Sequence, residues 1–327
     1  MKPPYSITND ILILVSSVSK SLGNIEGVFF QTPEPKLRKQ NKIKTIHATL
    51  EIEGNTLTLE QVTAILEGKR VLGPKQEIIE VQNVNKLYDF IESFNWGRVD
   101  DFLHAHKVLM DLLIESAGQF RHKNVGVLKA SKVSHIAPKP NLVSELIHNL
   151  FNWIEKDETH ALIKSCVCHY EIEFIHPFED GNGRMGRFWQ TLILQDFNPI
   201  FRYIPVESLI KDNQKTYYSV LEKCDKAGDS TAFVEFMLSL IDESLKNYLA
   251  EHTNVSLIGR DRLNLAKDHF QDHEFSRKDY LALFKNLSSA TASRDLKNGL
   301  ETKLLKKKGN ANQTKYRFQS KIRYTDS

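Results

Sequence analysis

Two runs of apolar residues at helical spacing flank a short glycine-rich segment in the middle of this chain of 327 residues. Their intervals of three and four residues predict two amphipathic helices. The first helix is expected to end near Pro177, because the residue before a proline avoids the helical conformation. The apolar positions are Leu162, Ile163, Cys166, Val167, Tyr170 and Phe174 in the first helix and Met185, Phe188, Trp189, Leu192 and Ile193 in the second.

The rest of the pattern predicts further helices and a few short strands. Residues 1 to about 95 are expected to be helical, and Thr58 with Gln61 forms the pattern of a capping box. Between residues 120 and 140, alternating apolar residues bounded by prolines predict a hairpin. One of its strands contains Val125, Gly126, Val127 and Leu128.

The last quarter of the chain has a pattern of its own. Residues 276–283 and 289–300 are predicted to form two short helices, and residues 303–308 and 315–318 two strands that turn at Gly309-Asn310. This order resembles a winged helix-turn-helix, in a module of about residues 255–327. The expected fold class is therefore mainly α, with a small hairpin and a C-terminal winged helix.

Charge distinguishes this module from the remainder of the chain. Residues 277–327 carry 13 basic and 4 acidic residues, a balance of +9, so the total of +3 leaves −6 for residues 1–276. A basic winged module is suited to contact DNA phosphates. The alternative is a docking or dimerisation surface, with Lys306, Lys307 and Lys308 solvated.

Composition points to a cytoplasmic protein. The 41% hydrophobic content is typical of soluble chains, and the apolar run at residues 11–15 is too short to span a membrane. Cys166 and Cys168 lie two apart on a helix and face different directions, so we expect reduced thiols rather than a zinc pair with His169.

The glycine-rich segment and its flanks combine several groups that act on phosphates. A glycine loop at a helix N-terminus binds anions, and Arg184 and Arg187 lie three apart, near one face of the next turn. Asp180 offers an oxygen ligand for Mg²⁺, and His176 is able to accept a proton near neutral pH. Taken singly, the arginines fit a solvated helix face and His176 fits a helix C-terminus; together they predict a nucleotide-phosphate site.

This segment, from His176 to Arg187, resembles the active-site loop of the Fic family, whose pattern is H-x-F-x-[D/E]-G-N-G-R-x-x-R. The resemblance implies a helical Fic core over about residues 98–245 and transfer of AMP from ATP to a Ser, Thr or Tyr hydroxyl of a protein. The target is either another protein or the enzyme itself. The resemblance also implies His176 as the base, Asp180 as the Mg²⁺ ligand and Phe178 as a structural anchor. It further implies that ATP is bound by Gly181, Asn182, Gly183, Arg184, Gly186 and Arg187.

A second segment resembles the inhibitory motif of the same family, [S/T]-x-x-x-E-[G/N]. It begins at Thr49 and contains Glu53, followed by Gly54. The simpler interpretation is a helix that ends with glycine as its cap. A carboxylate in the last turn opposes the helix dipole, however, and a cationic partner would resolve that conflict. The resemblance implies that the partner is Arg187 and that Glu53 occupies the place of the γ-phosphate.

Two further assignments depend on the resemblance. The predicted hairpin resembles the Fic flap, which aligns a target segment as an additional strand, and an ordinary surface hairpin is the alternative. Tyr217, Tyr218 and Asp225 match positions near the adenosine of relatives, whereas core or surface packing is the alternative for the tyrosines.

The sequence therefore predicts a self-inhibited protein adenylyltransferase that uses ATP and Mg²⁺. One alternative is a hydrolase that removes AMP from proteins and uses Glu53 to orient water. Another is a DNA-binding regulator in which the Fic core only senses nucleotide. A homo-oligomer is compatible with each of these functions, and a membrane partner is not expected.

Overall fold

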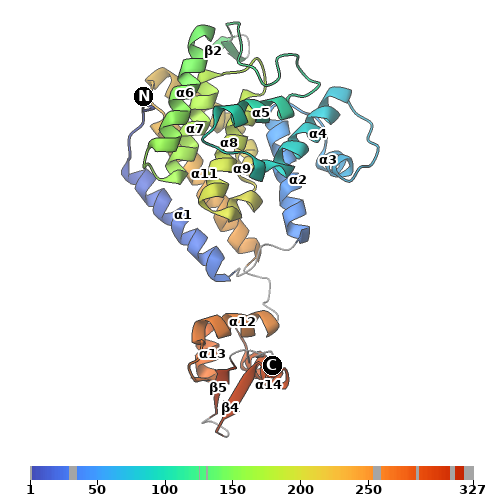
Figure 1. Ribbon diagram of the computed structural model, residues 1–327, viewed down its shortest axis with the longest axis vertical. Coiled ribbons are helices and arrows are strands. Elements are labelled where there is room, and N and C mark those ends of the chain that lie inside the picture. Colours follow the sequence, from blue (N-terminus) through green and yellow to red (C-terminus); the bar gives the residue numbers. More distant parts are fainter. Residues whose placement is uncertain are drawn as a thin grey trace, which may run out of the picture. The chain divides into compact units, whose positions relative to one another are not determined.

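The computed structural model describes residues 2–28, 35–124, 126–129, 132–252, 259–284, 287–309 and 314–319. They belong to two compact units, Met1–Glu251 and His252–Ser327 (Figure 1). The mainly helical fold with a small antiparallel sheet near the C-terminus confirms the predicted fold class.

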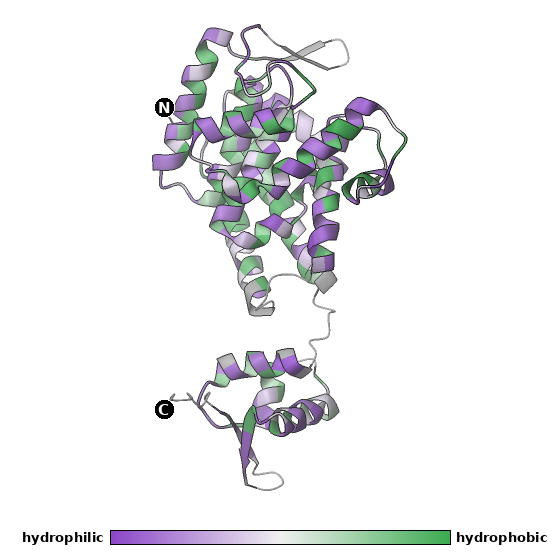
Figure 2. Cartoon of the chain, turned by 45° about the vertical axis from the view of Figure 1, so that its right-hand side comes forward, coloured by the Kyte–Doolittle hydropathy of each residue, from purple (hydrophilic) through white to green (hydrophobic). Residues whose placement is uncertain are grey.

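The first unit is helical apart from one hairpin, and the helices of the first 95 residues pack within it. Figure 2 shows hydrophilic residues on its outer helices and hydrophobic residues towards its interior. Its helices are α1 (Asn9–Val28), α2 (Pro35–Ile52), α3 (Leu59–Leu66), α4 (Lys75–Asp89), η1 (Ile91–Ser93), α5 (Val99–Leu109), α6 (Pro140–Lys156), α7 (Ala161–Ile175), α8 (Asn182–Phe197), η2 (Pro199–Tyr203), α9 (Val206–Asp212), α10 (Gln214–Ala227) and α11 (Thr231–His252).

The two helices predicted around the glycine-rich segment are α7 and α8, and they pack against each other at the centre of this unit. The prediction that α7 is amphipathic is wrong. Even Lys164, Ser165 and His169 are buried, because α7 is covered by α6, α8 and the rings of Tyr217 and Phe233. A helix that is buried on all sides does not show a polar stripe.

Two sequence signals in the N-terminal part correspond to observed helix ends. Thr58 and Gln61 form a reciprocal capping box at the start of α3. Gly54 adopts φ 91° two residues beyond the end of α2, a conformation that a glycine cap permits. The chain therefore turns sharply where Glu53 leaves α2.

The predicted hairpin is formed by β1 (Gly126–Lys129) and β2 (Lys132–Ile136), which pair antiparallel. Its register shifts between Val127 and Leu128. Val125 lies outside the described residues. The hairpin stands next to the N-terminal end of α6, and Figure 1 shows it at the margin of the unit.

The second unit combines helices α12 (Gly259–Phe270), α13 (Arg277–Leu283) and α14 (Ser289–Glu301) with a three-stranded antiparallel sheet. The strands β3 (Phe275–Ser276), β5 (Lys315–Phe318) and β4 (Leu305–Lys308) lie in that order. Strand β4 starts later than the sequence predicted, because Lys303 adopts φ 59° and turns the chain first. Within the described residues, no helix of either unit is long and apolar enough to cross a membrane.

Candidate active site

The glycine-rich segment forms a loop that joins α7 to α8. His176 ends α7 in the left-handed conformation, with φ 51° and ψ 60°, and its N–H donates to the carbonyl of Ile172. Gly181 has φ 83° and precedes α8, whose first turn receives no hydrogen bond from a capping side chain. The α8 amides thus meet the loop as an uncapped helix N-terminus, which favours an anion.

The loop is held in shape by its own side chains. The Asn182 amide donates 3.0 Å to the carbonyl of Phe178 and accepts 2.9 Å from its N–H. The side chain of Asn182 thereby stabilises the conformation of the loop. Phe178 is fully buried, and its ring stacks on that of His106 with centroids 3.6 Å apart.

His106 fixes the loop from the side of α5. Its Nδ1 accepts 2.9 Å from the N–H of Gly118, so the neutral ring carries its proton on Nε2 and donates 3.0 Å to the carbonyl of Asp180. Burial lowers the pKa of His106 to about 4. The ring is therefore neutral at physiological pH and positions the backbone of the predicted metal ligand.

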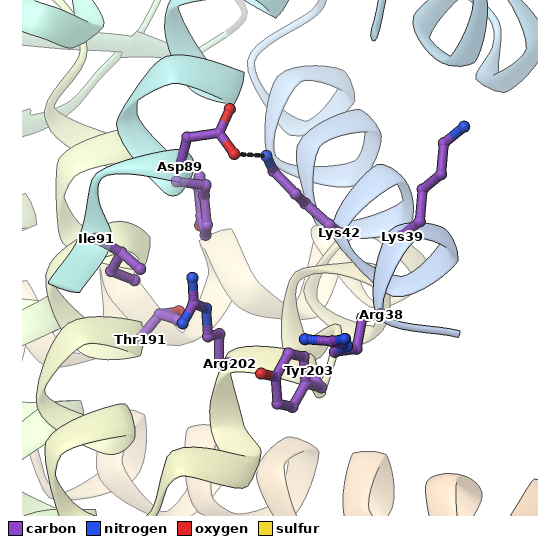
Figure 3. Close-up of a pocket in the computed structure, with 9 residues that line it drawn as sticks. Arg38, Lys39, Lys42, Asp89, Ile91, Thr191, Arg202 and Tyr203 are labelled. Atoms are coloured by element: carbon purple, nitrogen blue, oxygen red, sulfur yellow. Dashed lines mark hydrogen bonds and ion pairs between the residues drawn. The ribbon is translucent and has the colours of Figure 1, made fainter. Parts of the chain in front are cut away.

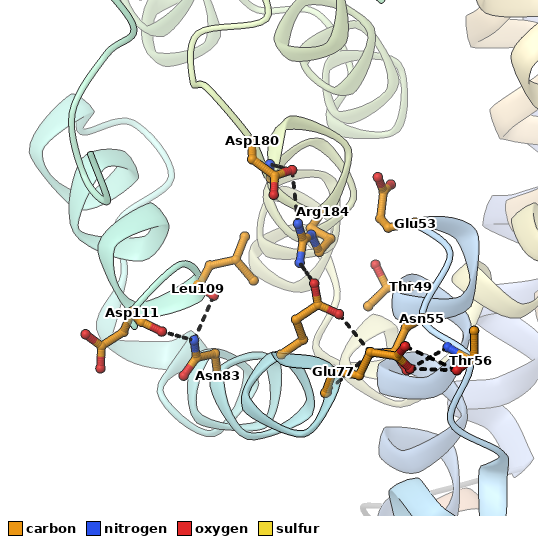
Figure 4. A network of polar contacts seen from close by, with 12 residues as sticks. Thr49, Glu53, Asn55, Thr56, Glu77, Asn83, Leu109, Asp111, Asp180 and Arg184 are labelled. Carbon is orange, nitrogen blue, oxygen red and sulfur yellow. Dashed lines mark hydrogen bonds and ion pairs between the residues drawn. The ribbon is translucent and has the colours of Figure 1, made fainter. Parts of the chain in front are cut away.

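Arg184 is almost fully buried in α8 and contacts two carboxylates (Figure 4). Its Nη1 donates 3.3 Å to Glu80 of α4, and its Nη2 donates 3.2 Å to Asp180, whose side chain is 56% exposed. Glu80 also accepts 2.8 Å from Asn55, in the segment that follows α2. The Arg184 Nε atom is buried without a hydrogen-bond partner.

Arg187 is 1% exposed and is bound by the end of α2. Its Nε donates 2.8 Å to the Thr49 hydroxyl, and its Nη2 donates 3.1 Å to the Thr49 carbonyl and 2.6 Å to Glu53. Burial alone would lower the pKa of Arg187, but the charge of Glu53, followed by Tyr217 and Glu173, raises it overall. The sequence motifs around Thr49 and Arg187 are 138 residues apart, and the structure joins them through a buried guanidinium.

Gly183 makes this arrangement sterically feasible. A Cβ atom at residue 183 would lie 2.5 Å from Glu53 Oε1 and 3.1 Å from both Arg187 Nη1 and Glu173 Oε1. Gly186 has a different role, since a Cβ there would lie 2.6 Å from the ring of His169 in α7. Gly186 therefore permits the close packing of α8 on α7.

The three residues expected near adenosine are distributed differently. Tyr217 is fully buried and donates 2.9 Å to Glu173 while contacting His169, so its side chain belongs to the core behind Arg187. Tyr218 is half-buried and donates 3.3 Å to the carbonyl of Ile52, at the end of α2. Asp225 accepts 2.9 Å from Tyr170. Of the three, Tyr218 is the one that contacts the end of α2, next to Glu53.

Arg121 is a residue that the sequence analysis did not single out as part of the site. It is 1% exposed, and its guanidinium donates to four carbonyls, those of His176 (2.7 Å), Lys123 (2.9 Å), Pro138 (2.6 Å) and Ile175 (3.3 Å). Lys123 and Pro138 flank the β1–β2 hairpin. Arg121 thus connects both ends of the hairpin to the backbone of His176. The only sequence signal for this role is the position of Arg121 just before the predicted hairpin.

The side chains of Asp180, Arg184 and Arg187 suit a nucleoside triphosphate bound with Mg²⁺. The buried Nη1 of Arg187 and Nε of Arg184 have no hydrogen-bond partners, and oxygens of an anion would satisfy both. In the part of the chain that the structure describes, no cluster of three or more His, Cys, Asp or Glu side chains is placed to hold a metal alone. Mg²⁺ bound to phosphates needs only one or two carboxylates, and Asp180 is an exposed one.

Comparisons with known proteins agree with this geometry. The Fic/DOC family profile matches residues 96–194. The chain is 28% identical over 228 residues to protein adenylyltransferase fic-1 of Caenorhabditis elegans, and 29% identical over 225 residues to protein adenylyltransferase Fic of Culex quinquefasciatus; each match covers 65% of this chain. It spans 42% and 43% of these two relatives, which is less than half of their length.

Solved structures extend the likeness to the whole chain. Fic-1 (residues 134–508) of C. elegans shares the fold, with a TM-score of 0.61 and 22% identity over 75% of this chain and 74% of that one. A Fic family protein from Desulfovibrio desulfuricans G20 is 37% identical, with a TM-score of 0.75 over 99% of this chain and 100% of that one. With the loop from His176 to Arg187 in place between α7 and α8, this chain is a member of the Fic family, distantly related to protein adenylyltransferases.

Proposed function

We propose that this protein is a self-inhibited adenylyltransferase that moves AMP from ATP to a Ser, Thr or Tyr hydroxyl of a protein. The observation that carries the proposal is the loop between α7 and α8. It brings a histidine, an uncapped helix N-terminus and two buried arginines into one continuous segment. Distant relatives that are named protein adenylyltransferases support the same reaction class.

In this mechanism His176 takes the proton of the incoming hydroxyl, whose oxygen bonds to the α-phosphorus. The bond from that phosphorus to the bridging oxygen breaks, and pyrophosphate leaves with the electron pair. The α8 amides together with Arg184 and Arg187 bind phosphate oxygens and hold them in line for attack. Mg²⁺, when bound beside Asp180, supplies neutralisation of the charge on the phosphates.

The inhibitory part of the proposal rests on Glu53. Its carboxylate accepts from Arg187 at 2.6 Å, where the resemblance assigns the γ-phosphate. Two anions cannot use the same guanidinium hydrogen without competing. Productive binding of ATP therefore requires Glu53 to leave, and the end of α2 acts as an inhibitory helix within the N-terminal region of about residues 1–95.

A second candidate function concerns the C-terminal unit, which we propose to be a winged helix that contacts DNA. Arg294 and Lys297 are exposed on α14, and Lys306, Lys307 and Lys308 are exposed on β4. Exposed cations on a winged unit are suited to contact phosphates. A protein substrate would then be bound through the catalytic unit and its β1–β2 hairpin, independently of this surface.

Incubation of the full chain with α-labelled ATP, Mg²⁺ and candidate proteins, followed by mass spectrometry of modified peptides, tests the function. AMP should be found on a hydroxyl side chain. His176→Ala should abolish transfer while ATP affinity stays near its original value, because the base contacts the hydroxyl rather than the phosphates. Asp180→Ala should remove activity together with its dependence on Mg²⁺. Near-normal transfer by His176→Ala would refute the assigned mechanism.

A further inference from the structure

A polar pocket lies on the N-terminal half of α2, and no residue of the loop between α7 and α8 lines it (Figure 3). It has a volume of about 280 Å³. Three residues of α2 face the ends of α4, η1 and η2 across it, and Thr191 of α8 contributes to its wall. The lining comprises Arg38, Lys39, Lys42, Tyr88, Asp89, Ile91, Thr191, Arg202 and Tyr203.

Four of the nine lining residues are cationic and one is anionic. Lys42 pairs with Asp89 at 2.6 Å, Lys39 pairs with Glu67 outside the pocket, and Arg202 pairs with Glu92. Arg38 differs from these three. Its Nε atom is buried and has no hydrogen-bond partner, although a buried donor of this kind normally has one.

The Arg38 and Arg202 guanidiniums both line the pocket, from α2 and η2, and an oxyanion there would be a partner for both. Guanidinium groups match the geometry of phosphate, because each presents two parallel N–H donors to two oxygens. The tyrosine rings of Tyr203 and Tyr88 give the pocket an apolar part beside its charges. We propose that this pocket binds the phosphate group of a small phosphorylated molecule and that its occupation strengthens the docking of α2.

The second half of this inference follows from the contacts around the pocket. Asn41 of α2 donates 2.8 Å to the carbonyl of Tyr203, so α2 already touches η2 beside the pocket. Behind its wall, the buried Glu207 accepts from Tyr88 (3.0 Å), Thr191 (3.1 Å) and Thr45 of α2 (3.4 Å). Both sets of contacts fix α2 against the body of the unit.

A phosphate held between α2 and η2 adds a further tie to the same helix. Since α2 carries Thr49 and leads into Glu53, any ligand that favours its docked position favours the contact of Glu53 with Arg187. The pocket would then be a regulatory site that deepens inhibition. This step rests on the proposed function, whereas the binding itself does not.

Binding is tested by isothermal titration calorimetry on the full chain, with inorganic phosphate and glycerol 3-phosphate as probes and glycerol as the uncharged comparison. Saturable binding is expected, and Arg38→Gln combined with Arg202→Gln should abolish it. Arg98→Gln, at an exposed arginine elsewhere in the unit, should bind as the parent does. Thermal melting of each variant confirms that it is folded.

Arg184→Ala separates this pocket from the catalytic loop, because binding in the pocket should survive the loss of a loop arginine. The stronger of the two probes identifies whether an organic phosphate or the bare ion is preferred. Absence of saturable binding, or binding that persists in the pocket variant and disappears in Arg184→Ala, would overturn the proposal.

The regulatory half is measured as AMP transfer with and without the bound probe. The probe should lower transfer by about fivefold or more in the parent and leave Glu53→Gly and the pocket variant unaffected. Binding without any change in transfer by an active parent would reject the regulatory role. Absence of transfer in every variant, with binding intact, would instead count against the proposed function and leave the pocket standing.

Discussion

The carboxylate of Glu53 lies against the backbone of Gly183, so closely that a Cβ atom there would stand 2.5 Å from Glu53 Oε1. Gly183 belongs to the first turn of α8, where alanine would normally be the better helix former. A glycine at this position therefore opposes helix propensity, at the point where the end of α2 meets the loop between α7 and α8.

This contact predicts an energetic coupling between the two residues. Gly183→Ala should destabilise the parent protein, but it should cost about 1 kcal/mol less in the Glu53→Gly background, where the nearest clashing atom has gone. Denaturant unfolding of the parent, both single variants and the double variant measures this difference. Additive effects within error would show that Glu53 does not press on residue 183 in solution.

Removal of the Glu53 carboxylate is expected to activate the enzyme. Glu53→Gly should raise AMP transfer about tenfold or more, equivalent to removing ~1.4 kcal/mol of competition for Arg187. Arg187→Ala should not show this gain, because it also removes the nucleotide clamp. Rates with α-labelled ATP decide the matter.

Two other outcomes of the same assay would be informative. Equal transfer by Glu53→Gly and the parent would show that the glutamate does not inhibit. Loss in Glu53→Gly of a measurable AMP-removing activity would favour the hydrolase that uses Glu53 to orient water.

Arg121 is predicted to position His176 without touching the substrate. Arg121→Lys keeps the positive charge but cannot reach four carbonyls at once, so kcat should fall by about 100-fold while the KM for ATP changes little. The measurement is best made in the Glu53→Gly background, where turnover is highest. Arg98→Lys is the matched control, and a rise in the KM for ATP with kcat unchanged would assign Arg121 to nucleotide binding instead.

The burial of neutral His106 predicts an acid-sensitive contribution to stability. Its pKa is lowered to about 4 in the folded protein from an ordinary value near 6.5. Its contribution is therefore complete above pH ~6.5 and is lost as the pH falls towards 4, by about 3 kcal/mol in all. His106→Gln should flatten this part of the stability profile, whereas His148→Gln, at an exposed histidine of α6, should leave it unchanged.

The basic strand β4 predicts salt-sensitive binding of DNA. If residues 306–308 contact phosphates, their replacement by alanine should reduce the slope of log affinity against log salt by about 0.9 per lost contact. Fluorescence anisotropy of a labelled duplex with the full chain provides the measurement, with alanine at the exposed Lys20, Lys107 and Lys215 of the first unit as control. Undetectable binding at about 50 mM salt would point to protein docking or dimerisation.

The sequence was most informative where local chemistry and local structure coincide. The loop from His176 to Arg187, the capping box at Thr58, helices α13 and α14 and strands β4 and β5 follow from short-range patterns, and the structure contains them. Helix α12 and strand β3 were not predicted. The approach of Glu53 to Arg187 was expected only through the family resemblance, because no local rule brings together residues 134 positions apart.

Other features depend on tertiary packing and left no local signal. The all-round burial of α7 is imposed by its neighbours, so its polar residues suggested an exposed face that does not exist. The burial of Tyr217 behind Arg187 and the close packing of Gly186 against His169 likewise depend on neighbours that are distant in sequence. Arg121 binds carbonyl groups, which every residue possesses, and its partners therefore cannot be recognised from residue types.

The near-complete burial of Arg187 has a consequence for how inhibition ends. Removing one partner from a buried ion pair costs about 3–5 kcal/mol when nothing replaces it. In the proposed enzyme, Glu53 would therefore not leave Arg187 before nucleotide binds. Instead, a phosphate of the incoming ATP would replace the Glu53 carboxylate as the anion that pairs with Arg187. Such an anion exchange would keep the activity low in the absence of ATP. The ATP concentration would then determine what fraction of the enzyme is inhibited.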